Sequence, residues 1–152
     1  MSDTQTSTTQ QLVVFSLGSE EYALPIASVH EIIRYTEPRS VVSEAAWIRG
    51  VIGLRGKIVP IYDLAARLGL LVDSQAGKIV IVETGADQVG VMVDDVEEVL
   101  TVSADQLEDV PSANMDSIDA IAKIGDRLVI LLNPEGLFAR TPAVDELAAP
   151  TS

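Results

Sequence analysis

The chain has 152 residues, of which 47% are hydrophobic and 4% aromatic, and its formal net charge is −13. This length suits one compact module or two small lobes that share a core. The acidity argues against a nucleic-acid-binding protein, because phosphate contacts need a basic face, and against docking on an anionic membrane surface. Without cysteine the chain has no disulfide, no thiolate metal site and no cysteine nucleophile.

The N-terminal segment, residues 1–10, is polar and rich in Ser, Thr and Gln, so we expect it to be disordered. It shows neither the basic start nor the apolar stretch of a signal peptide. The longest apolar runs in the chain are far shorter than the roughly twenty residues that cross a membrane. We therefore expect a cytoplasmic protein without membrane insertion. Residues 141–152 are expected to form a flexible C-terminal tail.

Segments rich in Val, Ile and Leu predict strands from the start of the ordered chain. Residues 11–17 and 20–25 are expected to form a hairpin around Gly18. Residues 26–33 mix two hydrophobic periods, which favours a short helical turn followed by a strand. Residues 37–47 are expected to form a loop.

The next segment, IRGVIGLRGKIVPIYDL, predicts a tight hairpin with strands at 48–54 and 57–62. Gly56 suits the turn, because glycine readily adopts the positive φ of a two-residue hairpin connection. Pro60 has no N–H to donate to a ladder, so we expect it at a sheet edge or a bulge. The segment is unusually basic for so acidic a chain, because it contains Arg49, Arg55 and Lys57.

Two short helices are expected, each directly after a strand. In residues 63–70, Asp63 is a suitable N-cap and Gly69 a suitable terminator. In residues 133–140, Asn133 is a suitable N-cap.

The second half of the chain continues with short strands and turns, including a glycine-acid turn at Gly125-Asp126. Residues 103–119 are expected to form a long acidic loop. No sequence repeat at a fixed period stands out. In total the chain predicts about ten short strands, which favours an all-β barrel or sandwich over a parallel α/β sheet. The strands expected in this half are 78–83, 88–93, 96–102, 120–125 and 127–132.

The residues offer no convincing catalytic constellation. Gly56-Lys57 lacks the first glycine and the Ser or Thr of a phosphate-binding loop. His30 is the only histidine, so a zinc site built on several histidines is excluded. Asp94-Asp95 resembles the acidic pair of a phospho-acceptor domain, but the alternating helices and parallel strands of that fold are missing. We therefore expect a binding module that is not an enzyme and that uses no cofactor or metal.

Four collinear blocks resemble the CheW family of chemotaxis coupling proteins. GLRGKIVPIYDL is similar to the family's central Leu-Arg-Gly and Pro pattern, and LVVFSLGSEEYALPIASVHEI to its opening strands. VGVMVDDVEEVL and KIGDRLVILLNPEGLF resemble its later blocks. The match covers residues 11–140. The chain departs from the pattern at Gly53, Ala45 and Ala23, where Asn, Pro and Gly are frequent, and these departures bear on partner choice.

The resemblance implies an all-β module at 11–140, with two small five-stranded SH3-like β-barrels packed side by side and a few short helices. It also implies a non-catalytic adaptor. Such a protein couples the cytoplasmic tips of methyl-accepting chemotaxis receptors to the regulatory domain of the histidine kinase CheA. The alternative is a small-ligand-binding or enzymatic β-barrel that uses a pocket between the lobes.

The same resemblance implies two interfaces. The kinase interface would include Arg49 and Gly50, although Gly50 could instead mark a bulge in a strand. The receptor interface would include a pair of charged residues that we expect to form an ion pair, since charges on partly buried strands are usually paired. A purely structural pair is an equal possibility, and on periodicity alone the apolar members are core residues. The receptor-interface residues are Ile26, Val29, Glu31, Arg55 and Ile79.

Overall fold

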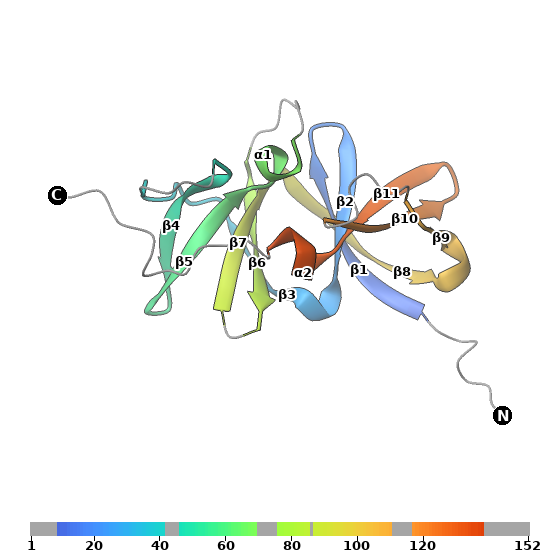
Figure 1. Ribbon diagram of the computed structural model, residues 1–152, viewed down its shortest axis with the longest axis horizontal. Coiled ribbons are helices and arrows are strands. Elements are labelled where there is room, and N and C mark those ends of the chain that lie inside the picture. Colours follow the sequence, from blue (N-terminus) through green and yellow to red (C-terminus); the bar gives the residue numbers. More distant parts are fainter. Residues whose placement is uncertain (1–8, 42–45, 70–75, 86, 111–116, 139–152) are drawn as a thin grey trace.

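The computed structural model describes residues 9–41, 46–69, 76–85, 87–110 and 117–138, which form two lobes side by side (Figure 1). The strands are β1 (Thr9–Leu17), β2 (Glu20–Pro25), β3 (Val29–Arg34), β4 (Ile48–Leu54), β5 (Lys57–Asp63), β6 (Lys78–Thr84), β7 (Asp87–Val93), β8 (Asp95–Ser103), β9 (Leu107–Glu108), β10 (Ile118–Ile124) and β11 (Arg127–Leu132). The helical segments are η2 (Ile26–Ser28), α1 (Leu64–Leu68), η3 (Ala104–Gln106) and α2 (Pro134–Leu137).

Lobe 1 is built on a six-stranded sheet in the order β8-β1-β2-β11-β10-β9, and lobe 2 on a five-stranded sheet in the order β3-β6-β7-β5-β4. This arrangement confirms the expected all-β fold with two SH3-like lobes and a few short helices. The sixth strand of lobe 1, β9, contains only two residues.

The second half of the chain repeats the first half in structure. β3 and β8 each have a register shift directly before a glutamate, Glu31 in VHEII and Glu98 in VEEVL. The hairpins β4–β5 and β10–β11 each have a register shift near their first residue, and each leads into a short capped helix. β5 and β11 both pair in parallel with the second strand of another hairpin, β7 and β2 respectively. The sequence hides this repeat because few residue identities match.

Each lobe combines strands from both halves of the chain. Lobe 1 takes β1 and β2 from the first half, and lobe 2 takes β6 and β7 from the second. The chain passes from lobe 2 back to lobe 1 at Asp94, whose backbone N–H donates to the carbonyl oxygen of Ser16 at 2.9 Å. Neither half of the chain therefore contains a complete lobe.

The buried residues form three clusters. One lies within lobe 1 and includes Leu12, Val14 and Leu131. Another lies within lobe 2 and includes Ile61 and Ile81. The largest cluster fills the contact between the lobes, here called the seam, which is made of Phe15, Leu17, Tyr22, Leu24, Ile48, Tyr62, Leu64, Val80, Val82, Val89, Val91, Val93, Leu132, Leu137 and Phe138. The alternative function, a small-ligand-binding or enzymatic β-barrel, required a pocket between the lobes, and side chains of the seam occupy that place.

Local capping signals in the sequence are confirmed. The Asp63 side chain accepts a hydrogen bond from the backbone N–H of Ala66, and Gly69 ends α1 with a left-handed φ of 72°. The Asn133 side chain accepts from the N–H of Glu135 at the start of α2. These caps fix where each β-hairpin passes into its helix.

The β4–β5 turn has the expected positive φ at Gly56, 80°, and a less expected one of 54° at Arg55. Pro60 was expected at a sheet edge or a bulge, but β5 lies between β4 and β7 and the register shift of this hairpin lies at the start of β4, so that prediction was wrong. Its opposite residue, Val51, exchanges its backbone hydrogen bonds with Arg39 instead. The missing N–H of Pro60 therefore breaks no bond between β4 and β5.

Some expected boundaries differ from those of the structure. β1 begins at Thr9, two residues before the expected start of the module. The expected acidic loop at 103–119 contains η3 and β9, so it is not a continuous loop. The two predicted tails fall almost entirely on residues 1–8 and 139–152, which lie outside the described residues.

Candidate functional site

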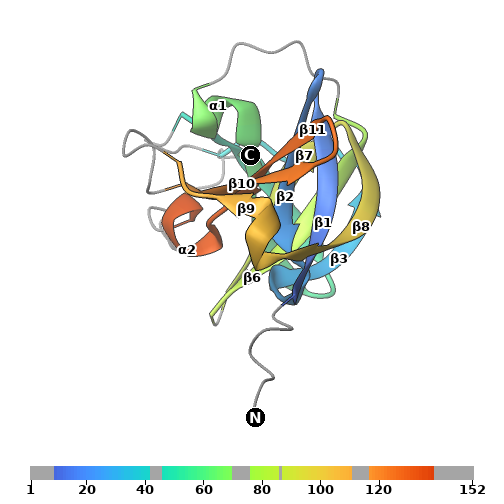
Figure 2. The ribbon, with the colours of Figure 1, turned by 90° about the vertical axis from the view of Figure 1, so that its right-hand side faces the viewer.

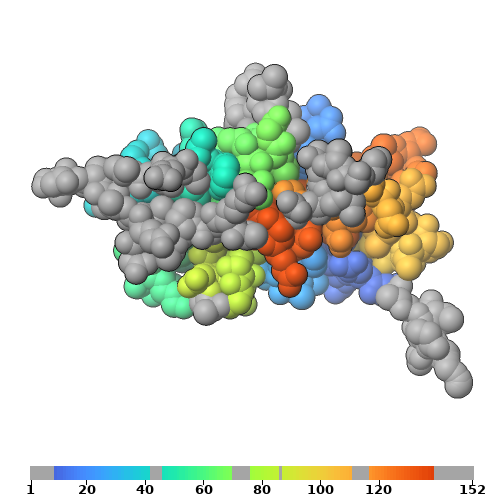
Figure 3. Space-filling model, viewed as in Figure 1, coloured from blue at the N-terminus to red at the C-terminus, as the bar shows by residue number. Residues whose placement is uncertain are grey.

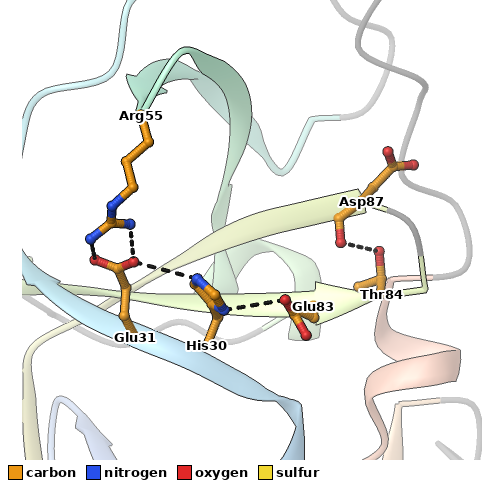
Figure 4. A network of polar contacts seen from close by, with 6 residues as sticks. All are labelled: His30, Glu31, Arg55, Glu83, Thr84 and Asp87. Carbon is orange, nitrogen blue, oxygen red and sulfur yellow. Dashed lines mark hydrogen bonds and ion pairs between the residues drawn. The ribbon is translucent and has the colours of Figure 1, made fainter.

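Glu31 and Arg55 form the expected ion pair. The guanidinium makes two hydrogen bonds to the carboxylate, and the distance from Nη2 to Oε2 is 3.0 Å (Figure 4). Glu31 lies on β3, and Arg55 lies in the turn that follows β4. Because β3 and β4 are the opposite edges of the five-stranded sheet, the pair links the two edges and closes lobe 2.

The Glu31–Arg55 pair lies at the surface. The Arg55 side chain is 66% exposed and that of Glu31 22% exposed. The hydrogen bond from Arg55 lowers the pKa of Glu31, with a further contribution from the positive charge of Arg55. The same bond raises the pKa of Arg55. Solvent screens an exposed pair of this kind, so its contribution to stability is modest and a partner can reach it.

His30 extends this pair into a longer polar network. Its Nε2 lies 3.7 Å from Oε1 of Glu31, and its Nδ1 lies 3.2 Å from Oε2 of Glu83 on β6 (Figure 4). His30 is the extra residue at the register shift of β3, and its side chain is 40% exposed. The network therefore places the imidazole of His30 between two carboxylates beside β3.

Lobe 1 contains a related group of ion pairs, between β11, β2 and β8, that the sequence did not indicate. Arg127 of β11 donates through Nε to Oε1 of Glu21 at 3.1 Å, and its Nη2 lies 2.7 Å from Oε2 of Glu98. Glu98 is the counterpart of Glu31 in the repeat, and β8 is an edge strand of its sheet. The hydrogen bonds to Glu21 and then Glu98 raise the pKa of Arg127.

Exposed aliphatic side chains lie beside the seam on lobe 2. Ile26 in η2 is 39% exposed, and Val29 packs partly against the seam. Ile32, 41% exposed, stands opposite Val80, which is a seam residue. Residues directly opposite each other in adjacent strands share a face of the sheet, so Ile32 lies on the seam side.

Val99 is the counterpart of Ile32 on lobe 1. It is 51% exposed, and it stands in one row with Val13 and the seam residue Leu24. β3 and β8 lie on the same side of the molecule in Figure 2. An ion pair between Lys78 of β6 and Asp95 of β8, 3.3 Å apart, crosses between the lobes. We call Ile26, Val29, Ile32 and Val99 the seam face.

Ile79 does not belong to this exposed surface. It is fully buried within lobe 2, packed with Ile61 and Ile81. Both faces of β6 are covered, because Val80 and Val82 on its other face belong to the seam. The prediction that Ile79 contacts a partner directly was wrong. Its side chain can act only by packing beneath the exposed residues of lobe 2.

Arg49 and Gly50 are neighbours on β4, but they have different structural roles. Arg49 is the extra residue at a register shift, is 57% exposed, and has its Nε 3.8 Å from Oδ2 of Asp63. A Cβ on Gly50 would lie 2.2 Å from the carbonyl oxygen of Arg39. Gly50 follows the register shift directly, in agreement with the bulge interpretation, and it also permits the close approach of its own chain at the Arg39–Val51 bridge.

Within the described ranges, no group of three His, Asp or Glu side chains is placed to hold a metal ion. Among the helices that the structure describes, none has the length and apolar character to cross a membrane. What the fold brings to the surface is a row of exposed aliphatic side chains next to paired charges. Such an arrangement is typical of a surface that recognises another protein.

Sequence reasoning missed Ile32, Val99 and Arg127. The signal for the first two was the pair of short segments VHEII and VEEVL, in which the aliphatic residue after each glutamate is exposed. Arg127 had no such signal, because its partners Glu21 and Glu98 are distant in sequence.

Comparison with known proteins places these features in context. The family model of the CheW-like domain matches residues 11–141. The probable chemotaxis protein CheW of Rhizobium etli is 35% identical over 138 residues, covering 87% of this chain and 89% of the relative. Chemotaxis protein CheW of Klebsiella aerogenes is 32% identical over 137 residues, covering 86% of this chain and 82% of the relative.

A solved structure has the same fold. The crystal structure of the scaffolding protein TtCheW from Thermoanaerobacter tengcongensis superimposes with a TM-score of 0.80 at 32% sequence identity. The alignment covers 92% of this chain and 99% of that protein.

Proposed function

The chain belongs to the family of CheW-like domains and is a chemotaxis adaptor, and we propose that it bridges the cytoplasmic tips of chemoreceptors and the regulatory domain of the histidine kinase CheA. It acts in the cytoplasm and without a catalytic step. The two proposed surfaces, the seam face and β4, belong to one body, because the seam joins the lobes through a shared core.

The seam face carries the receptor-binding part of this proposal. Ile26, Val29 and Ile32 offer aliphatic contacts along β3 and η2, and Glu31, which pairs with Arg55, lies on the same strand as Val29 and Ile32. A helical receptor tip would place an apolar stripe against such side chains. Ile79 supports this surface from inside lobe 2.

The kinase-binding part rests on β4. Arg49 is 57% exposed at a bulge beside Asp63, so a partner can reach its side chain with an acidic group. Gly50 keeps β4 close to Arg39, and so it shapes the surface rather than contacting the kinase itself.

A co-sedimentation assay tests the proposal. Receptor signalling fragments assembled on vesicles are mixed with the regulatory domain of CheA, with and without this chain. The kinase domain should pellet with the receptor only when the chain is present. Equal amounts of kinase domain in the pellet with and without the chain would refute the bridging role.

The matched variants for this assay are Ile26→Asp and Leu128→Asp. Both residues are exposed aliphatics, but Ile26 belongs to the seam face, whereas Leu128 lies on β11 and is 60% exposed. Only Ile26→Asp should reduce pelleting of the chain with receptor, and loss in both variants would point to a general effect of the added charge.

A further inference from the structure

Arg67 joins α1 of lobe 2 to α2, which follows the last strand of lobe 1. Its Nε donates to the carbonyl oxygen of Leu137 at 3.0 Å, and its Nη2 donates to that of Gly136 at 3.1 Å. The guanidinium carbon also lies 5.2 Å from the centre of the Trp47 ring. One side chain of α1 therefore contacts two other segments of the chain at once.

Arg67 donates hydrogen bonds to carbonyl oxygens at the C-terminal end of α2. The last carbonyl groups of a helix lack partners within the helix. α1 ends at Gly69 in a left-handed conformation, whereas α2 ends at Phe138 with a φ of −105°, and the Phe138 N–H donates to the carbonyl oxygens of Pro134 and Gly136. The carbonyl oxygen of Leu137 accepts from Arg67. A positive charge at a helix C-terminus is also favourable. Arg67 thus acts as the C-terminal cap of a helix that belongs to the other half of the repeat.

This contact breaks the symmetry of the repeat. The helix position that Arg67 occupies in α1 is occupied in α2 by Leu137, which is fully buried in the seam. α2 therefore inserts an apolar side chain between the lobes, while α1 holds α2 in place from outside. Phe138 continues the insertion, with its ring 5.0 Å from that of Tyr62 in edge-to-face contact.

α2 lies at the surface between the two lobes (Figure 3). In Figure 2, α1 and α2 lie on one side of the molecule, and β3 and β8 lie on the other. The seam is held on the side of β8 by the backbone bond from Asp94 to Ser16 and by the Lys78–Asp95 ion pair. The seam is thus fastened on two sides by different means.

We infer that Arg67 is an interlobe latch, which holds α2 in the seam and thereby fixes the relative position of the lobes. The latch itself does not depend on the proposed function. Its consequence for partners does, because the seam face takes residues from both lobes, so its spacing depends on how the lobes sit against each other.

Amide hydrogen exchange on the full chain, without any partner, tests the latch. In Arg67→Met, which keeps an apolar stem but removes the charge and the donors, the N–H groups of Leu137 and Phe138 should exchange roughly tenfold faster, as expected for the loss of hydrogen bonds from a charged group. These groups donate to Asn133 and Pro134. The interlobe N–H of Asp94 should also exchange faster.

Lys57→Met is the matched control. It removes one positive charge from lobe 2 at the other end of β5, about 20 Å from the end that leads into α1. Exchange at the three reporter amides should be unchanged there. Trp47 is the only tryptophan, so its fluorescence gives a second readout, and acrylamide should quench it more strongly in Arg67→Met than in the control.

If Arg67→Met does not fold, Arg67→Lys replaces it. Lysine keeps the charge but lacks the planar fork that serves two carbonyls and a ring face together, so a smaller acceleration is expected. Unchanged exchange at Leu137 and Phe138 would overturn the latch, and acceleration confined to those two amides, with Asp94 unchanged, would overturn its control of the seam. Neither result bears on the co-sedimentation assay, which tests the adaptor role separately.

Discussion

Glu31 of β3 and Glu98 of β8 occupy equivalent places in the two halves of the chain, and each pairs with an arginine from a hairpin of its own lobe. Arg55 approaches Glu31 from the β4–β5 turn, and Arg127 approaches Glu98 from the start of β11. The two arginines differ in one respect, because Arg127 binds a second carboxylate, that of Glu21. This difference predicts that the two lobes respond differently when an arginine is removed.

Arg127→Met should lower the midpoint of urea unfolding more than Arg55→Met. Arg127→Met leaves two neighbouring carboxylates without a positive partner, whereas Arg55→Met leaves one. Both effects are modest, since all the side chains involved are partly exposed. Lys123→Met is the control, because among the described residues Lys123 pairs with Glu108 alone, and both side chains are more than half exposed. A larger loss in Arg55→Met than in Arg127→Met would contradict the prediction.

The stabilisation from Glu31 should depend on pH in a defined direction. Arg55 lowers the pKa of Glu31 in the folded chain below the ordinary value of 4.5. The contribution is therefore complete above that value and is lost as the pH falls through the lowered folded pKa. Glu31→Gln should unfold at slightly lower urea than the parent chain near neutral pH. The difference between the two urea midpoints should disappear in acid. A difference that grew as the pH fell would contradict the predicted direction.

Gly50→Ala should destabilise the chain by roughly 1–3 kcal/mol, the usual cost of a forced backbone conformation. The new Cβ would lie 2.2 Å from the Arg39 carbonyl oxygen, and the φ of Gly50 is 155°. Gly53→Ala is the matched control on the same strand, because no atom lies within 4 Å of its added Cβ. Chemical denaturation measures the free energy of unfolding of both variants. Equal stability would show that the Arg39–Val51 bridge can shift to accept the new Cβ without a loss of stability.

Local sequence signals predicted much of the fold. The caps at Asp63 and Asn133 and the turn at Gly56 depend on residues within a few positions of each other, so the sequence shows them directly. The position of Pro60 was predicted wrongly because it depends on a residue from another part of the chain. Arg39 takes the backbone hydrogen bonds of Val51, the residue opposite Pro60, so β4 needs no N–H from Pro60. No local rule contains that information.

The candidate site was predicted less well for a related reason. Ile79 and Ile32 are both aliphatic residues on neighbouring strands, yet the first is fully buried and the second 41% exposed. A strand covered on both faces, such as β6, gives no alternation to distinguish them. The Glu31–Arg55 pair followed from family resemblance, since spacing alone does not bring the two residues together.

Arg49→Glu should weaken binding to the CheA regulatory domain, in titration calorimetry, by about tenfold or more. Arg49 is exposed at a bulge, so reversing its charge acts on association rather than on packing. The new carboxylate would face Asp63, the N-cap of α1, so circular dichroism must confirm the fold. Lys57→Glu makes the same charge change elsewhere on lobe 2. Equal weakening by both variants would show that the effect comes from net charge and not from the position of Arg49.

Val99→Asp should weaken receptor binding as strongly as Ile32→Asp, although the two residues belong to different lobes. Both are aliphatic, both are about half exposed, and both stand on the seam side of their sheets. A receptor helix that lies along the seam must touch both, so a charge in either place meets its apolar stripe. Neither substitution should alter stability much, since neither side chain is buried. Binding to receptor fragments on vesicles gives the measurement, with Leu128→Asp as the exposed aliphatic control. If Ile32→Asp abolished binding while Val99→Asp bound like the parent chain, the receptor would contact lobe 2 alone, and the seam face as defined by its four residues would be wrong.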